Sequence, residues 1–395
     1  MMIMMIMMIL MMIIMINKFF YHIKKLIYEN LINIIYYYIY KNMNTENLES
    51  NQTNQTIVDS VPLLDENHSR LTILPINPKF EIFWNLYKKQ LESFWQASEV
   101  DFSNDFKDYM SLSEEEKQFV RMILAFFSAS DGIVNFNIQK RFMNEIKIQE
   151  VLVMLGFQYM MENIHGEVYS NMLNNIITNE TERKYLFNAI ENIESIKLMK
   201  EWAFKWIESQ KSISYVIFAA GIIEGLFFSG AFASIFWLKM MRGKNRLFME
   251  GLIKSNKLIS RDEGMHTNSD AAMYKFVTPI PKEDAHDMIE EAIALVDKFH
   301  RDGIKVDMIG MNIRMMDEYI RYVADRLLVL FGYDKKYQAM NPFPFMELIG
   351  LDTKGNFFET RPTEYQTAHN DTNMNWNFEL EDWFNKPKVN HNYRS

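Results

Sequence analysis

Met160–Tyr169 reads MMENIHGEVY and is the most informative stretch of this 395-residue chain. Glu162, His165 and Tyr169 stand at i, i+3 and i+7, so a helix places their side chains on one face. The neighbours on that face are apolar, which indicates that it points into a core. A carboxylate and an imidazole that are buried together need a compensating partner, and a metal ion is a direct one.

A second turn of the same kind is Glu263–His266, which reads EGMH. Two such turns, with one acid from each of two other helices, form the ligand set of di-iron and di-manganese carboxylate bundles. The spacing alone is a weak signal, because 51 acids and 8 histidines should give roughly one acid-x-x-His match by chance. Two further matches occur, Asp65–His68 in a polar stretch and Glu283–His286 in a charged helix start, and we assign neither a role.

The two missing acids are each isolated in an apolar segment. Glu224 is the only charge in Ser212–Leu238, and Asp131 is the only charge between Arg121 and Lys140. Ser212–Leu238 is long enough to span a membrane. A carboxylate at its middle nevertheless favours the central, fully buried helix of a soluble bundle. For Asp131 alone, a hydrogen-bonded acid in the core is the simpler interpretation. Along the chain, however, Asp131 precedes the first Glu-x-x-His turn and Glu224 precedes the second. This order indicates four helices around one centre.

The predicted fold is therefore all-α, a ferritin-like helical bundle with a di-metal carboxylate site in its core. Its predicted ligands are Asp131, Glu162, His165, Glu224, Glu263 and His266. Four carboxylates and two neutral imidazoles carry a charge of −4, which two divalent cations neutralise. Mixed oxygen and nitrogen ligands suit iron or manganese better than zinc or calcium.

Composition narrows the class of protein further. The chain has no cysteine, which excludes disulfides, thiolate zinc sites and cysteine nucleophiles and favours an intracellular, cytoplasmic protein. The net charge of −9 gives no reason to expect nucleic acid as a partner. A hydrophobic content of 48% supports a large core.

We predict four regions along the chain. Residues 1–43 form a low-complexity leader rich in Met, Ile and Tyr, which we expect to be dispensable, with Met43 as an alternative start. Its opening run of 16 apolar residues is short for a membrane span and lacks the features of a signal peptide, so a membrane-surface anchor is the less favoured interpretation. Residues 44–61 are a polar linker, 62–345 the bundle, and 346–395 a flexible tail.

The sequence resembles the small, radical-generating subunit of class I ribonucleotide reductase, of the eukaryotic type. The resemblance covers most of the chain, and its ordered motifs are specific in combination. They are Ser93–Asp101 (SFWQASEVD), Ser128–Gly132 (SASDG), Glu162–His165 (ENIH), Glu224–Phe232 (EGLFFSGAF), Ile259–His266 (ISRDEGMH), Asn356–Arg361 (NFFETR) and Glu364–Gln366 (EYQ).

The resemblance implies a role for each matching residue. The family's metal ligands fall on the six residues given above, and its radical-bearing tyrosine falls on Tyr169. The remaining matches are the apolar shield of the radical (Phe228, Phe232 and Ile259), the electron path from the surface to His165 (Trp95 and Asp262) and the mobile tyrosine that passes the radical on (Tyr365).

The implied function is that of the small subunit of ribonucleoside-diphosphate reductase, a homodimer with two iron ions per chain, manganese being the alternative. The metals, Tyr169 and an external donor acting through Trp95 would supply the electrons that reduce O2. A chain without cysteine cannot perform dithiol chemistry, so the radical must pass to a cysteine-bearing large subunit, bound through the tail. Another ferritin-like di-iron oxidase or hydroxylase, or an iron-storage protein, remains an alternative, but neither needs Tyr169, Trp95 or Tyr365.

The tail departs from the family, whose members tend to end on an acidic, aromatic segment that inserts into the large subunit. Here Phe378–Phe384 (FELEDWF) has that composition, but residues 385–395 follow it. We predict that deleting 385–395 leaves large-subunit binding within a few-fold, whereas Trp383→Ala combined with Phe384→Ala weakens it by ~2 kcal/mol, since buried aromatic anchors dominate such contacts. Titration of both variants against the large subunit checks this. Loss of binding in the deletion alone would assign the contact to Lys386, Lys388 and Arg394 instead.

Overall fold

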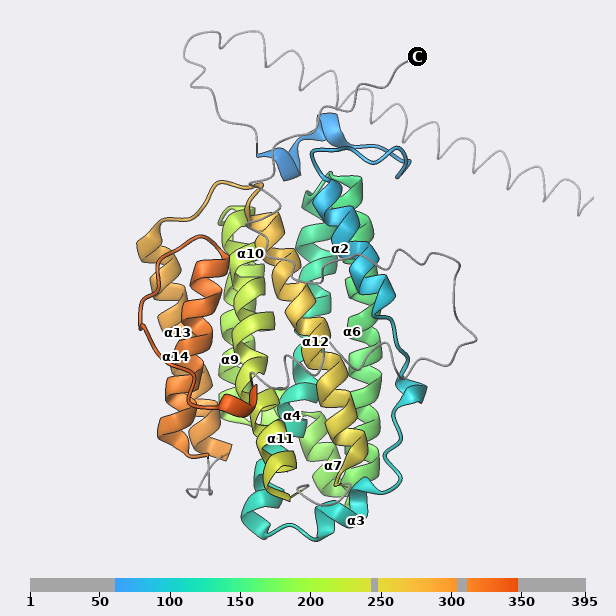
Figure 1. Ribbon diagram of the computed structural model, residues 1–395, viewed down its shortest axis with the longest axis vertical. Coiled ribbons are helices and arrows are strands. Elements are labelled where there is room, and N and C mark those ends of the chain that lie inside the picture. Colours follow the sequence, from blue (N-terminus) through green and yellow to red (C-terminus); the bar gives the residue numbers. More distant parts are fainter. Residues whose placement is uncertain (1–60, 243–247, 304–310, 347–395) are drawn as a thin grey trace, which may run out of the picture. The chain divides into compact units, whose positions relative to one another are not determined.

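The computed structural model describes residues 61–242, 248–303 and 311–346. The predicted leader, nearly all of the linker and the tail beyond Met346, with Tyr365 and the Phe378–Phe384 segment, lie outside the described residues. Over the described part the all-α prediction is confirmed, because every regular element there is a helix. The long helices stand side by side as an upright bundle (Figure 1).

The longer helices are α2 (Glu81–Glu92), α4 (Glu114–Asn137), α6 (Gln149–Ile176), α9 (Glu194–Ile207), α10 (Ile213–Ile222), α11 (Phe228–Arg242), α12 (Glu250–Tyr274), α13 (Lys282–Gly303) and α14 (Ile313–Leu330). Shorter α-helices are α3 (Asp105–Met110), α5 (Met143–Glu145), α7 (Glu180–Phe187) and α8 (Ala189–Asn192). Two π-helical turns, η4 (Ile138–Phe142) and η5 (Ile223–Phe227), and three 3₁₀ turns, η1 (Pro62–Leu64), η2 (Glu66–His68) and η3 (Ala97–Glu99), complete the described elements.

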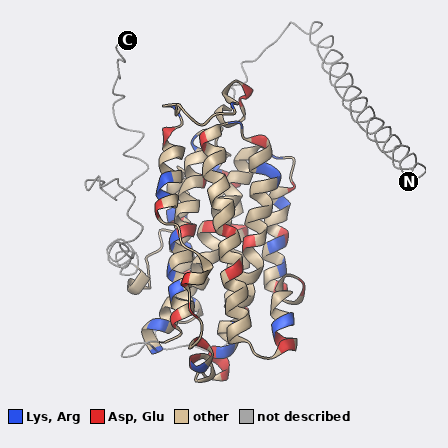
Figure 2. Cartoon of the chain, turned by 90° about the vertical axis from the view of Figure 1, so that its right-hand side faces the viewer, with Lys and Arg blue, Asp and Glu red and all other residues tan. Residues whose placement is uncertain are grey.

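Four of these elements, α4, α6, η5 and α12, surround the centre of the bundle. Helix α4 packs against α6, and α12 packs against α10, η5 and α11 as well as against α6. Long stretches of the helices carry no Lys, Arg, Asp or Glu, as the tan segments of Figure 2 show. The buried side chains of these helices form one hydrophobic core, and their packing against one another holds the helices side by side.

The apolar segment around Glu224 is a core helix with a widened turn at its middle. The sequence predicts a single helix over Ser212–Leu238, whereas the structure divides the run into α10, the π turn η5 and α11. Among the described residues, Ile213–Arg242 and Glu114–Glu145 are long and apolar enough to span a membrane, but 89% and 67% of their most apolar windows are buried in the bundle. Burial in a protein core explains this composition.

The start of α12 is fixed by close contacts with the first residue of α3 and with the segment before it. The carboxylate of Asp105 accepts hydrogen bonds from the backbone N–H groups of Gly251 (3.1 Å) and Leu252 (2.7 Å). A Cβ atom on Gly251 would lie 2.5 Å from the backbone oxygen of Asp101. Glycine therefore allows α12 to approach this backbone, and that approach sets the position of every residue farther along the helix.

We predict that Gly251→Ala lowers the free energy of unfolding by about 2 kcal/mol. The new methyl group would clash with the backbone oxygen of Asp101, so α12 would have to move away from it. Gly156→Ala is the matched control: it replaces a helical glycine whose new Cβ meets no atom within 4 Å. This control should leave stability unchanged or raise it by about 0.5 kcal/mol. Urea unfolding of both variants measures the difference, and equal stabilities would refute the close approach.

Candidate metal centre

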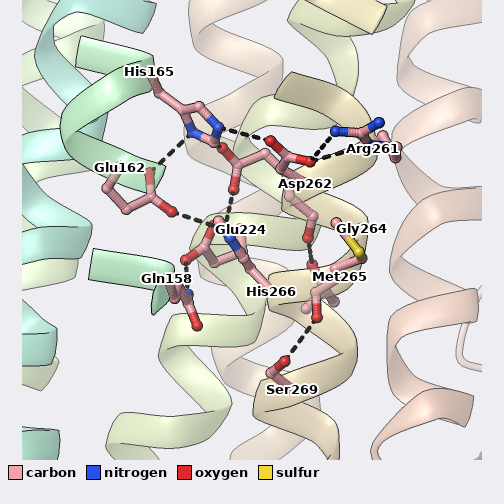
Figure 3. Close-up of polar contacts among 12 residues, drawn as sticks. Gln158, Glu162, His165, Glu224, Arg261, Asp262, Gly264, Met265, His266 and Ser269 are labelled. Carbon is pink, nitrogen blue, oxygen red and sulfur yellow. Dashed lines mark hydrogen bonds and ion pairs between the residues drawn. The ribbon is translucent and has the colours of Figure 1, made fainter. Parts of the chain in front are cut away.

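The six predicted ligands meet at the middle of the bundle, although they come from four separate elements. Asp131 lies on α4, Glu162 and His165 on α6, Glu224 on η5, and Glu263 and His266 on α12. None is more than 3% exposed. Figure 3 shows Glu162, His165, Glu224 and His266 converging on a common space between their helices.

Their ligand atoms form two overlapping groups. Glu162, Glu224, Glu263 and His266 form one group, and Asp131, Glu162 and His165 form the other, each with its ligand atoms within 4.8 Å of one another. Glu162 thus belongs to both groups. The arrangement offers places for two cations with a shared carboxylate between them.

In both Glu162 and Glu263, one carboxylate oxygen lies near His165 and the other lies near His266. Glu162 Oε2 lies 3.3 Å from His165 Nδ1, and Glu162 Oε1 lies 2.7 Å from His266 Nδ1. Glu263 Oε1 lies 3.1 Å from His165 Nδ1, and its Oε2 lies 3.1 Å from His266 Nδ1. Each carboxylate therefore has one oxygen beside each histidine, and both would help to hold the metal pair.

Several oxygens of this cluster have no hydrogen bond to any described residue. They are both oxygens of Asp131 and one each of Glu162, Glu224 and Glu263; the last three lie near imidazole nitrogens without meeting hydrogen-bond geometry. Buried polar atoms without partners are costly and rare in proteins. Two divalent cations would satisfy these oxygens and balance the four carboxylate charges, so the residues fit such a pair.

The electrostatics of the cluster show how strongly these groups act on one another. Burial raises the pKa of the Asp131 and Glu224 carboxyls well above the usual range. Burial is the largest single influence and would lower the pKa of His165 and His266, but the carboxylates around them, Glu162 foremost, together outweigh it and raise both pKa values well above normal. Without metal, the cluster is therefore neutralised by protons, which metal binding would release.

The outer nitrogen of His165 is held by a hydrogen-bonded chain. His165 Nε2 lies 3.2 Å from Asp262 Oδ2, and the Trp95 indole N–H donates to the same oxygen at 2.6 Å. The guanidinium of Arg261 donates to Asp262 Oδ1 at 2.9 Å. Because Asp262 accepts the Nε2–H of His165, Nδ1 faces the cluster and would offer its lone pair to a metal once its proton is released.

Trp95 is buried, with 2% of its surface exposed, and its ring stacks on His165 at 5.9 Å between centroids. The structure thus brings Trp95, Asp262 and His165 into contact with one another through hydrogen bonds. It places the indole within the protein, however, so the surface end of the predicted path is not Trp95 itself.

Tyr169 lies in a buried aromatic pocket, one helical turn beyond His165 on α6. It is 1% exposed, and its hydroxyl has no hydrogen-bond partner among the described residues. Its ring stacks on Phe127 at 4.7 Å, and Phe127 lies against Phe228 (6.1 Å) and Phe232 (5.4 Å). The remaining residue of the predicted shield, Ile259, is fully buried on α12.

Two residues of the site were not singled out in the sequence. Phe127 is the ring in direct contact with Tyr169, and its position four residues before Asp131 places it on the same face of α4. Gln158 stands four residues before Glu162 and donates its amide N–H to Glu224 Oε1 at 3.0 Å. In both cases the spacing of four residues from a predicted ligand could have identified the residue from the sequence.

The two acid-x-x-His matches that were set aside lie outside the cluster. Asp65 and His68 approach to 3.8 Å and are each partly exposed. Glu283 is exposed in the first turn of α13.

Comparison with known proteins gives one consistent result. Residues 72–342 match the family model described as ribonucleotide reductase, small chain. The chain is 47% identical over 310 residues to the ribonucleoside-diphosphate reductase small chain of Yaba-like disease virus, covering 77% of this chain and 92% of that protein. It is 46% identical to ribonucleoside-diphosphate reductase subunit M2 of Danio rerio, covering 78% and 79%.

Solved structures agree with the sequence comparisons. The structure of the ribonucleotide reductase Rnr4 homodimer from Saccharomyces cerevisiae superposes with a TM-score of 0.65 at 31% identity. The match covers 74% of this chain and 91% of the yeast chain.

We predict that Glu224→Ala reduces the metal content below two ions per chain, because it removes the only acid that η5 gives to the cluster. Loading with Fe(II) or Mn(II), removal of free metal and elemental analysis measure the content. Glu208→Ala is the control: Glu208 forms an ion pair with Lys140 on the surface, so its loss should change nothing. Two retained ions in the Glu224→Ala variant would show that Glu224 is not a ligand.

Proposed function

The chain belongs to the family of ribonucleotide reductase small chains, and we propose that its buried cluster is a dinuclear iron centre that generates a stable radical on Tyr169. The observation that carries this proposal is the convergence of six buried ligands beside a tyrosine on the same helix as two of them. As a ribonucleoside-diphosphate reductase small subunit, the chain is an oxidoreductase component.

The metal pair would supply the electrons that reduce dioxygen and the oxidising power that removes one electron from Tyr169. Asp131, Glu162, His165, Glu224, Glu263 and His266 would hold it. The donor set suits iron, and manganese is the alternative. The contribution of the protein is the position of these ligands, the charge balance of the core and the exclusion of water.

The surroundings of Tyr169 suit a long-lived neutral radical. Oxidation of a phenol releases its proton, and Asp131 is the carboxylate with the strongest electrostatic effect on the Tyr169 hydroxyl, whose pKa burial raises well above normal. Phe127, Phe228 and Phe232 then keep water and reductants away from the ring.

Trp95 and Asp262 would carry the additional electron towards the centre. The chain from indole N–H through Asp262 Oδ2 to His165 Nε2 consists of two hydrogen bonds that meet on one oxygen. Such a continuous contact path links the indole with a ligand of the centre. This arrangement favours radical generation over iron storage or a plain di-iron oxidase, neither of which needs a conducting path.

The radical must act on another protein, because ribonucleotide reduction ends in dithiol chemistry and this chain has no cysteine. We propose a cysteine-bearing large subunit as the partner, bound through the tail, with Tyr365 at the exit of the radical. The yeast relative is a homodimer, and we propose the same state for this chain in the cytoplasm.

We predict that Tyr169→Phe keeps both metal ions and still reacts with O2 but yields no stable tyrosyl signal in electron paramagnetic resonance. Only the phenolic oxygen is removed, while the buried ring and its stacking on Phe127 remain. Tyr159→Phe is the control, since Tyr159 lies on the same helix but is only partly buried and outside the ligand groups. A signal of normal intensity in the Tyr169 variant would place the radical on another residue.

A further inference from the structure

One buried acid near the centre is not among the six ligands and has no partner to explain it. Asp270 on α12 is 1% exposed, and neither of its carboxylate oxygens has a hydrogen bond to a described residue. An isolated buried carboxyl group is costly unless something compensates it. Its burial raises the pKa of the carboxyl group well above normal, while the nearby His266 acts in the opposite direction.

Asp270 stands one helical turn beyond His266. Glu263, His266 and Asp270 share the face of α12 that lines the cluster, because residues three, four and seven apart lie on one side of a helix. Side chains on a helix lean towards its N-terminus, so the carboxyl group of Asp270 leans back towards the imidazole of His266.

The ring of His266 directs Nδ1, and not Nε2, to the cluster. Every hydrogen bond and ion pair of His266 with described residues runs through Nδ1, at 2.7 Å to Glu162, 3.1 Å to Glu263 and 3.6 Å to Glu224. Nε2 is on the other side of the ring, away from these carboxylates. A metal-ligating histidine almost always donates its second N–H to a carboxylate, carbonyl or water.

The other histidine of the centre already has such a partner. His165 also directs Nδ1 to the cluster, and its Nε2 contacts Asp262. Asp270 lies on α12, as Asp262 does, and is a buried carboxylate that can accept the second N–H of His266.

This inference rests on the proposed metal centre. We propose that Asp270 is a positioning residue for His266. When metal is bound, its carboxylate accepts the Nε2–H of His266, directly or through one water. Asp270 thereby fixes the ring with Nδ1 towards the metal and strengthens it as a ligand. The centre would then have a supporting carboxylate behind each of its two histidines, Asp262 behind His165 and Asp270 behind His266.

The test is an anaerobic titration of the full chain with Mn(II) against a chelating indicator, which gives the affinity for each ion. Asp270→Ala should weaken one of the two ions by about 10- to 100-fold and leave the other within a few-fold, as expected for the loss of one supporting carboxylate. Asp270→Asn keeps an acceptor but not the charge, so it should weaken the same ion by about threefold or more, and less than alanine does.

Ser269→Ala is the matched control. Ser269 is the buried neighbour of Asp270, and its hydroxyl accepts from Gln90 on α2 instead of facing the cluster. This variant should bind both ions as the wild type does.

Wild-type affinity for both ions in Asp270→Asn would overturn the proposal, whether or not the alanine variant folds. Equal weakening of both ions, with a lower melting temperature of the metal-free protein, would also overturn it, because it would show a purely structural role. Failure of the unmodified chain to bind two ions would instead refute the proposed centre, and is thus distinct from failure of the Asp270 inference.

Discussion

The structure depends on the neutralisation of four carboxylates that share a dry core with two imidazoles. Among the described residues no lysine or arginine forms an ion pair with Asp131, Glu162, Glu224 or Glu263, and the side chains that contact these acids there are histidines and one glutamine. Burial of such charges is tolerated only with compensation. Two divalent cations would supply that compensation, and the long apolar helices surround the cluster with buried side chains. Binding and folding are therefore linked, since any ion bound only by the folded chain stabilises it.

The surroundings of His165 and of Tyr169 differ in polarity, and the difference suits the two roles proposed for them. Beyond the Nε2 atom of His165 lies a polar chain of Asp262, Trp95 and Arg261, joined by hydrogen bonds. Around Tyr169 the contacts are aromatic, and its hydroxyl has no described partner. A connected polar path suits delivery of an electron, whereas an apolar pocket suits storage of an uncharged radical. The α6 helix carries both His165 and Tyr169 and so joins the two environments.

Much of the site could be predicted from the sequence, because its acids stand out. Glu224 and Asp131 are isolated charges in apolar segments, and the two Glu-x-x-His turns follow helical spacing, so a common centre was the economical interpretation. What depends on packing between distant segments could not be predicted. The π turn at Glu224, the contact of Phe127 with Tyr169, the burial of Trp95 and the lack of partners for Asp270 all arise from neighbouring helices. The leader, the linker and the tail remain predictions from composition and resemblance.

The central claim is that the six-residue cluster binds two metal ions, and anomalous X-ray diffraction from crystals of the metal-loaded protein tests it most directly. Data collected on both sides of the iron or manganese absorption edge locate each ion and identify its element. Our account predicts two peaks per chain inside the cluster, one beside Asp131 and His165 and one beside Glu224 and His266, with Glu162 and Glu263 between them. A single ion in the cluster, or ions bound only elsewhere, would contradict the account.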